Sequence, residues 1–188
     1  MDMISRLDPV LSAVWNGIYA TRPLGRVFLY MLLGVLLWTV LAVGAERRGR
    51  EDGWRRFCAV FAAGCAACLL YMTVMSRSET PYGGLHLRPF VSFTLAREEN
   101  AEYYRSMLMN VYLFFPFGLA APFALSRRRR PVLLTCALAA CLSVCIEAAQ
   151  YALSLGWAET DDVIMNTLGA LIGGASHLAA RLIRRHVI

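Results

Sequence analysis

The sequence predicts an all-α, polytopic membrane protein, a bundle of about five transmembrane helices preceded by an N-terminal amphipathic helix. Hydrophobic residues make up 58% of the 188 positions and charged residues only 17%, whereas a soluble domain carries about 25% charged residues. The apolar residues also gather into runs close to the roughly 20 helical residues that a bilayer crossing needs. Composition and run length therefore favour a membrane protein over a soluble domain.

The first 26 residues differ from the rest. Ile4, Leu7 and Leu11 begin a helical repeat of apolar positions, and Arg6 and Asp8 stand between them. This pattern is typical of an amphipathic helix that lies in the membrane interface or packs on the bundle. We therefore divide the chain into an amphipathic segment, 1–26, and a transmembrane domain, 27–188.

Five apolar runs follow in order, and each predicts a membrane span: Val27–Ala45, Phe57–Met75, Met107–Leu125, Val132–Leu153 and Asp162–Ile183. The third run contains Asn110 and Pro116, and the fifth contains Asn166 and His177. Polar or irregular spans are tolerated where they face other helices rather than lipid. The third and fifth spans are therefore predicted to lie inside the bundle.

The basic residues predict the orientation. The chain has no lysine, and its arginines concentrate in the first loop (47–56), the third loop (127–130) and the C-terminal segment (181–185). Short cytoplasmic loops carry an excess of Lys and Arg. We expect a multi-pass protein of the cell membrane with its N-terminus outside and its C-terminus cytoplasmic. Basic segments beside spans meet anionic lipid headgroups, so the net charge of +6 predicts membrane lipids as partners and no nucleic acid.

Polar residues near the predicted outer ends of the spans form the candidate site. We refer to them as the polar cluster: Arg88, Asn110, Glu147, Gln150, Asp161, Asp162 and Asn166. At 1.5 Å per helical residue, Glu147 lies ~9 Å and Asn166 ~6 Å inside their span ends, and Asn110 enters from the same side. Three helices thus bring polar groups to one shallow layer.

Each member also has a structural interpretation. Asp161 and Asp162 follow Thr160 at a helix start, where acids satisfy free N–H groups. Asn110 and Gln150 are also typical of interhelical hydrogen bonds. A carboxylate inside hydrocarbon is costly, by about a few kcal/mol on insertion scales, so we favour a functional role for Glu147 over a structural one.

Arg88 has two open interpretations. It either clamps an anionic ligand group bidentately or only neutralises a nearby acid. Because it precedes the third span on the predicted outer side, it is the natural counter-charge of the polar cluster.

Spacing predicts how the last two spans face each other. Ser143, Glu147 and Gln150 share one side of a helix. Asp162 and Asn166 continue at helical spacing into Gly169 and Gly173, whose small size permits close approach of a neighbouring helix. We expect these glycines to pack against the fourth span.

The longest segment between spans runs from Ser76 to Ser106. Its stretch 86–93 is too apolar for a solvated loop, and is expected to cap the bundle or dip into the interface. From Leu95 the composition favours a helix that continues into the third span.

The chain resembles the VanZ-like family of bacterial membrane proteins. The segments that carry the resemblance are Leu87-Arg88-Pro89-Phe90, the run 110–118 (NVYLFFPFG), Glu147-Ala148-Ala149-Gln150 and the run 161–173 (DDVIMNTLGALIG). These core motifs span 86–173. The resemblance implies a multi-pass envelope protein, and the namesake of the family is linked to low-level resistance to the glycopeptide teicoplanin. The family often has asparagine at the place of His86, and an arginine where this chain has Gly156-Trp157-Ala158-Glu159.

Three functions remain open. The first is an envelope factor that binds a lipid-linked or lipophilic molecule, such as a cell-wall lipid precursor or the glycopeptide. The second is an enzyme on an envelope substrate, with Glu147 or Asp162 as general base and Arg88 holding an anionic group. The third, a small transporter or structural subunit, would need polar residues across the whole membrane. No metal-ligand constellation, phosphate loop or nucleophile elbow is present, so we predict no metal and no cofactor.

Overall fold

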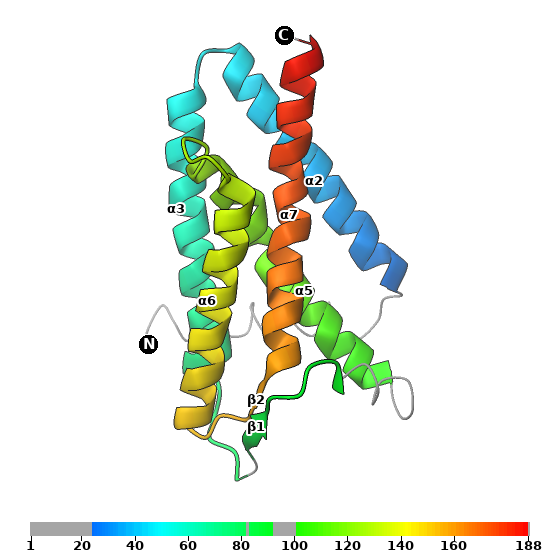
Figure 1. Cartoon of the computed structure of the whole chain (residues 1–188), viewed down its shortest axis with the longest axis vertical. Coiled ribbons are helices and arrows are strands. Elements are labelled where there is room, and N and C mark those ends of the chain that lie inside the picture. The colour runs from blue at the N-terminus through cyan, green and yellow to red at the C-terminus, as the bar shows by residue number, and fades with distance from the viewer. Residues whose placement is uncertain (1–23, 82, 92–100, 188) are drawn as a thin grey trace, which may run out of the picture.

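The computed structural model describes residues 24–81, 83–91 and 101–187. Its long helices are α2 (Leu24–Arg47), α3 (Glu51–Leu70), α5 (Ala101–Ala124), α6 (Pro131–Ala152) and α7 (Thr160–Val187). A π-helical turn, η1 (Tyr71–Met75), continues α3, and two short strands are β1 (Gly84–His86) and β2 (Trp157–Glu159). The predicted helical bundle is confirmed (Figure 1). The predicted amphipathic helix lies almost wholly outside the described residues, as does the helical start expected from Leu95.

Five of the helical segments are long and apolar enough to cross a membrane: Val27–Arg47, Glu51–Met75, Arg105–Ala124, Pro131–Ala152 and Thr160–His186. They coincide with the five predicted runs. The second begins six residues earlier than Phe57, because the charged residues of the first loop start the helix. The chain is therefore a multi-pass membrane protein.

The third and fifth spans lie inside the bundle, as their polar residues predict. In the most apolar stretch of each helix, 67% of the residues of α5 and 50% of those of α7 are buried, against 22% to 28% in the other three spans. α5 and α7 form the most extensive helix pair, and α5 also contacts α3, α6 and α2. The least apolar helices thus occupy the interior, where lipid does not reach them.

Glycines bring α5 and α7 together. A Cβ added at Gly169 would overlap the backbone of Val111, and one at Gly173 would overlap the backbone of Phe115. From the other side, a Cβ at Gly118 would overlap the backbone of Ala170. The partner of the two α7 glycines is therefore the third span, and the expectation that they pack against the fourth is wrong. α6 contacts a neighbouring side of α7, where Ser143 and Asn166 meet.

The arginine-rich segments meet at one end of the bundle. Arg184 of α7 contacts Glu46 of α2 at 3.0 Å, and Arg127 after α5 contacts Asp52 of α3 at 3.2 Å. Figure 1 shows the α2–α3 connection and the C-terminus at this end. The shared side that the sequence predicts for these segments is confirmed.

The two strands lie at the opposite end (Figure 1). β1 pairs with β2 in parallel, with Gly84 opposite Trp157 and His86 opposite Glu159. A Cβ at Gly84 would overlap the Trp157 ring, and one at Gly83 would lie 2.7 Å from the carbonyl oxygen of Gly156. The absence of a side chain at Gly83 and Gly84 is thus what permits the strands to pair. The described part of the segment expected to cap the bundle, 86–91, begins in β1 and contacts Asp161 at the start of α7 through Phe90.

Candidate functional site

One face of α6 supplies the centre of the site. Ser143, Glu147 and Gln150 are spaced at i, i+4 and i+7, and all three are buried. Positions on the other side of α6, such as Val144 and Tyr151, are exposed. A helix that buries its polar face and exposes its apolar face is inverted relative to a helix in water, as expected where lipid surrounds the bundle. The shared face predicted for these three side chains therefore points into the protein.

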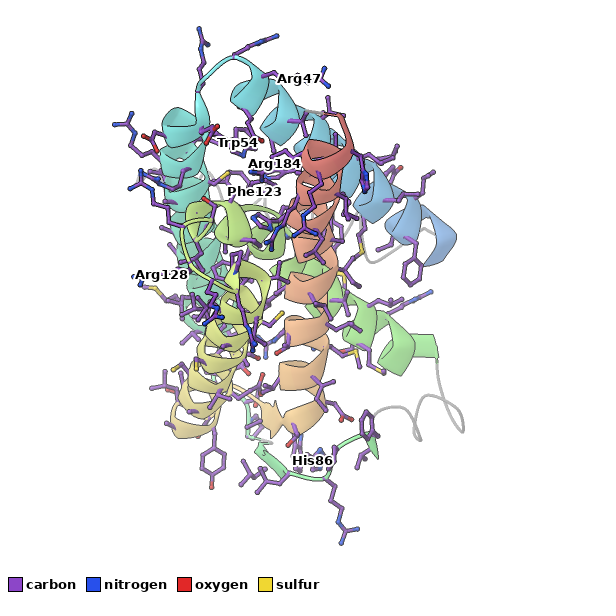
Figure 2. All side chains as sticks on the ribbon, turned by 45° about the horizontal axis from the view of Figure 1, so that its top comes forward. Arg47, Trp54, His86, Phe123, Arg128 and Arg184 are labelled. Carbon is purple, nitrogen blue, oxygen red and sulfur yellow. The ribbon has the colours of Figure 1, made fainter. Side chains whose placement is uncertain are left out.

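Glu147 ties α6 to the strand pair. Its Oε2 accepts a hydrogen bond from the backbone N–H of Glu159, at 2.9 Å. The Glu159 carboxylate in turn lies 3.5 Å from Nδ1 of His86 on β1. His86 stacks on Trp157, with ring centroids 4.3 Å apart, and Figure 2 shows His86 at this end of the molecule. The strands thus place a second acid, Glu159, beside the buried glutamate and an imidazole beside that second acid.

Gln150 links α6 to the widened end of α3. Its Nε2 donates to the backbone carbonyl of Thr73, at 2.9 Å. Thr73 lies in the π-helical turn η1 at the end of this span, and the last carbonyls of a helix have no partner within the helix. The interhelical hydrogen bond that the sequence offered as one interpretation of Gln150 is therefore present.

Asn166 links α6 to α7 one turn deeper. Its Nδ2 donates to the hydroxyl oxygen of Ser143, at 2.8 Å. Its Oδ1 is buried and has no hydrogen-bond partner among the described residues, and the same holds for Nδ2 of Asn110 on α5. An unpaired buried polar atom costs about 1–3 kcal/mol. One amide acceptor on α7 and one amide donor on α5 are therefore left without a partner in the interior of the described bundle.

The two aspartates at the start of α7 have different surroundings. Asp161 is buried, and its Oδ1 accepts a hydrogen bond from the backbone N–H of Phe90. This contact fastens the loop after β1 to α7. Asp162 is half-buried and lies within electrostatic range of Glu147 and Glu159. The first aspartate thus holds the loop in place, and the second belongs to a group of acids.

Arg77 is the arginine whose charge acts on both Glu147 and Asp162. Its guanidinium Nη1 lies 3.7 Å from where a Cβ of Gly156 would stand. Arg88, the counter-charge expected from the sequence, is exposed in the loop after β1. Arg77, which is also exposed, therefore lies beside Gly156 at the start of the stretch that leads into β2.

We call Glu147, Glu159, Asp162 and Arg77 the carboxylate site. Three acids near one arginine gather carboxyl oxygens, which are hydrogen-bond acceptors, at this end of the bundle. Such a site suits a ligand that presents N–H or O–H donors, such as an amine or the hydroxyls of a sugar. Among the residues that the structure describes, no group of three His, Cys, Asp or Glu side chains could hold a metal ion.

Sequence reasoning brought forward Glu147, Gln150, Asp162 and Asn166 but missed Glu159 and Arg77. Glu159 stands only two residues before the paired aspartates, which was an available signal. Arg77 follows the second span directly, and that position indicates only a span end. Its nearness to Gly156 depends on the return of the chain through β1 and β2.

Comparison with known proteins identifies one family. A family model described as VanZ/LLP1 matches residues 61–181. The matched range begins within α3 and ends within α7, so it includes every residue of the carboxylate site. No curated protein and no solved structure matches the chain.

Proposed function

The chain belongs to the VanZ/LLP1 family, and on this premise we propose that it is an envelope protein that binds a lipid-linked or lipophilic ligand at the carboxylate site. The ligand presents N–H or O–H donors to Glu147 and Asp162, and its apolar part lies along the lipid-facing helices. Through this binding the protein lowers the action of a teicoplanin-type glycopeptide. The placement of the arginine-rich end in the cytosol is part of the proposal, because it turns the carboxylate site outward.

The observation that carries the proposal is the burial of Glu147 within a membrane span, 8% exposed, with a backbone N–H as its direct hydrogen-bond partner. An amide oxygen can also accept a hydrogen bond from a backbone N–H. A charged group at this depth costs a few kcal/mol on insertion scales, so structure alone does not require a carboxylate. A ligand that pairs with the carboxylate supplies the reason for its presence.

The unpaired amide atoms of Asn110 and Asn166 support the same proposal. They lie on α5 and α7, and Asn166 is bonded to the α6 face that holds Glu147. A ligand head that enters between the strands and the helix ends would meet the carboxylates first and the amide of Asn166 one helical turn deeper. Orientation through both would give such a ligand a defined pose.

Glycopeptide susceptibility at equal expression tests this function. We expect Glu147→Gln and Asn166→Ala to abolish most of the protection, because a lost hydrogen bond to a charged group is worth about 1.5–3 kcal/mol, or tenfold or more in ligand affinity. Glu79→Gln is the matched control, since Glu79 is exposed on the segment that follows η1. Unchanged protection in both site variants would separate the carboxylate site from the function.

A second candidate is an enzyme that acts on an envelope lipid. The charge interaction between Glu147 and Asp162 favours it, because two neighbouring carboxylates disfavour being charged at the same time, so one can serve as an acid while the other serves as a base. Arg77 would then hold an anionic group of the substrate. Incubation of the purified protein with cell-wall lipid precursors distinguishes the two: product formation that Asp162→Asn abolishes supports the enzyme, and binding without turnover supports the envelope factor.

A further inference from the structure

A pocket lies at the arginine-rich end of the bundle, opposite the carboxylate site. Side chains from four helices and the turn after α5 line it, among them Glu46, Trp54, Arg55, Phe123, Ser126 and Arg184. Figure 2 shows Trp54, Phe123 and Arg184 gathered between α3 and α7. We propose that this pocket binds a phosphate group, carried by the headgroup of an anionic phospholipid or free in solution.

Trp54 provides a hydrogen-bond donor that the protein does not use. Its indole Nε1 is buried and has no partner among the described residues, although Trp54 lines the pocket. Indole N–H is a donor only, and it normally finds an acceptor when it is buried. The pocket therefore needs an acceptor, and phosphate oxygens are acceptors.

Arg184 provides further donors. Its Nε and Nη1 lie 3.0 Å and 3.1 Å from the two carboxylate oxygens of Glu46. A guanidinium has five N–H groups, so its second terminal nitrogen remains for another anion. Arg55 and the Ser126 hydroxyl line the same pocket, and Arg55 contacts Asp52 through one terminal nitrogen, at 2.9 Å. Two acids, Glu46 and Glu51, also line the pocket, so the donors that remain for an anion are the indole N–H of Trp54 and the guanidinium N–H groups that do not contact Glu46 or Asp52.

The charge of this end favours an anion. The segments 46–56, 126–130 and 181–186 contain twelve arginines and only three acids. Part of this charge is exposed and screened by salt, but the pocket lies among these segments. An anion seated there gains from the surrounding field in addition to its direct contacts.

The aromatic side chains next to the pocket favour a lipid as the source of the phosphate. Trp54 packs against Trp38 and Phe57, with ring centroids 5.4 Å and 5.5 Å apart. Phe57 is 51% exposed and Val60 74% exposed on the outer side of α3. Tryptophan is enriched at membrane–water interfaces, and an acyl chain could follow this apolar surface from a headgroup in the pocket.

Native mass spectrometry of the full-length protein extracted from mixed bilayers tests the proposal. We expect retention of phosphatidylglycerol over phosphatidylcholine. Trp54→Phe keeps an aromatic ring against Trp38 but removes the N–H, and we expect it to lower retention about tenfold, the value of one hydrogen bond to a charged acceptor. Arg184→Gln should lower it at least as much. Arg185→Gln is the matched control, because Arg185 is exposed on the next position of α7 and does not line the pocket.

A further variant separates binding from structural support. Glu46→Gln breaks the same ion pair as Arg184→Gln but leaves the guanidinium in place, so we expect retention equal to or above that of the wild type. Equal loss in Glu46→Gln and Arg184→Gln would overturn the proposal, because the ion pair would then act only to hold the helices. Equal retention in Trp54→Phe, Arg184→Gln and Arg185→Gln would overturn it as well.

Thermal unfolding of the protein in neutral detergent without phospholipid distinguishes the two sources of the phosphate. Thermal stabilisation by inorganic phosphate that depends on Trp54 and Arg184 supports the site with free phosphate as its ligand. Stabilisation by phosphatidylglycerol but not by inorganic phosphate, again dependent on Trp54 and Arg184, supports the site with a lipid as its ligand. No stabilisation by either would contradict the proposal.

Discussion

Alanine substitution is predicted to change stability in opposite directions at two glycines, because only one of them lies where α5 and α7 approach closely. At Gly169 an added Cβ meets three backbone atoms of Val111, its Cα at 3.0 Å and its carbonyl group nearer still. Backbone atoms cannot rotate away, so the two helices must separate. At Gly64 on α3, nothing lies within 4 Å of the added Cβ. Alanine therefore disrupts the helix packing at Gly169 but disturbs no contact at Gly64.

The magnitude follows from two opposing effects. Overpacking of a tight contact costs about 1–3 kcal/mol, and the backbone overlap at Gly169 places this case at the upper end. Replacement of glycine by alanine inside a helix contributes roughly 0.5–1 kcal/mol in favour of folding. The net loss for Gly169→Ala is then about 2 kcal/mol, and Gly64→Ala gains up to about 1 kcal/mol.

Thermal unfolding in one detergent measures the difference. At about 2–4 °C per kcal/mol for a chain of this length, Gly169→Ala should lower Tm by roughly 4–8 °C, whereas Gly64→Ala should leave it unchanged or raise it by up to about 4 °C. Intrinsic tryptophan fluorescence on heating provides the signal. A Gly169→Ala protein that unfolds at or above the wild-type temperature would refute the inference that these helices touch through their backbones.

Two further predictions concern the carboxylate end of the bundle. Asn166→Ala removes the hydrogen bond to Ser143 and should cost about 0.6–1.7 kcal/mol; a double-mutant cycle with Ser143→Ala checks this, and fully additive effects would show that the two side chains do not interact. Gly84→Ala forces a Cβ into the Trp157 ring, so we expect β1 to separate from β2, seen as faster hydrogen exchange at 84–86 and a shift in Trp157 emission. Unaltered exchange there would contradict the strand pairing.

Much of the fold could be predicted from local pattern. Five apolar runs are enough to predict five helices in a membrane, because hydrocarbon admits few other forms of backbone. The polar residues in the third and fifth runs correctly placed those helices inside the bundle, since polar side chains are unfavourable in contact with lipid. The four family motifs between 86 and 173 correctly identified the family that the match to residues 61–181 shows.

The site was predictable only where it follows a single helix. Ser143, Glu147 and Gln150 share a face because helical spacing puts them there, whatever the rest of the chain does. Their contacts with Glu159 and with Thr73 come from segments 12 and 77 residues away. No periodic pattern connects such distant positions, and strands of three residues are too short to show a repeat of their own.

The sequence by itself determined which residues enter the membrane and which side of each helix is polar, because both depend on neighbours within a few residues. Tertiary structure alone decided that Gly169 and Gly173 meet α5 rather than α6, and that Arg77 rather than Arg88 acts on Glu147 and Asp162. The physical reason is that helix partners are selected by the fit of whole surfaces. Any small residue permits a close contact, and the complete set of surfaces decides which helix makes it.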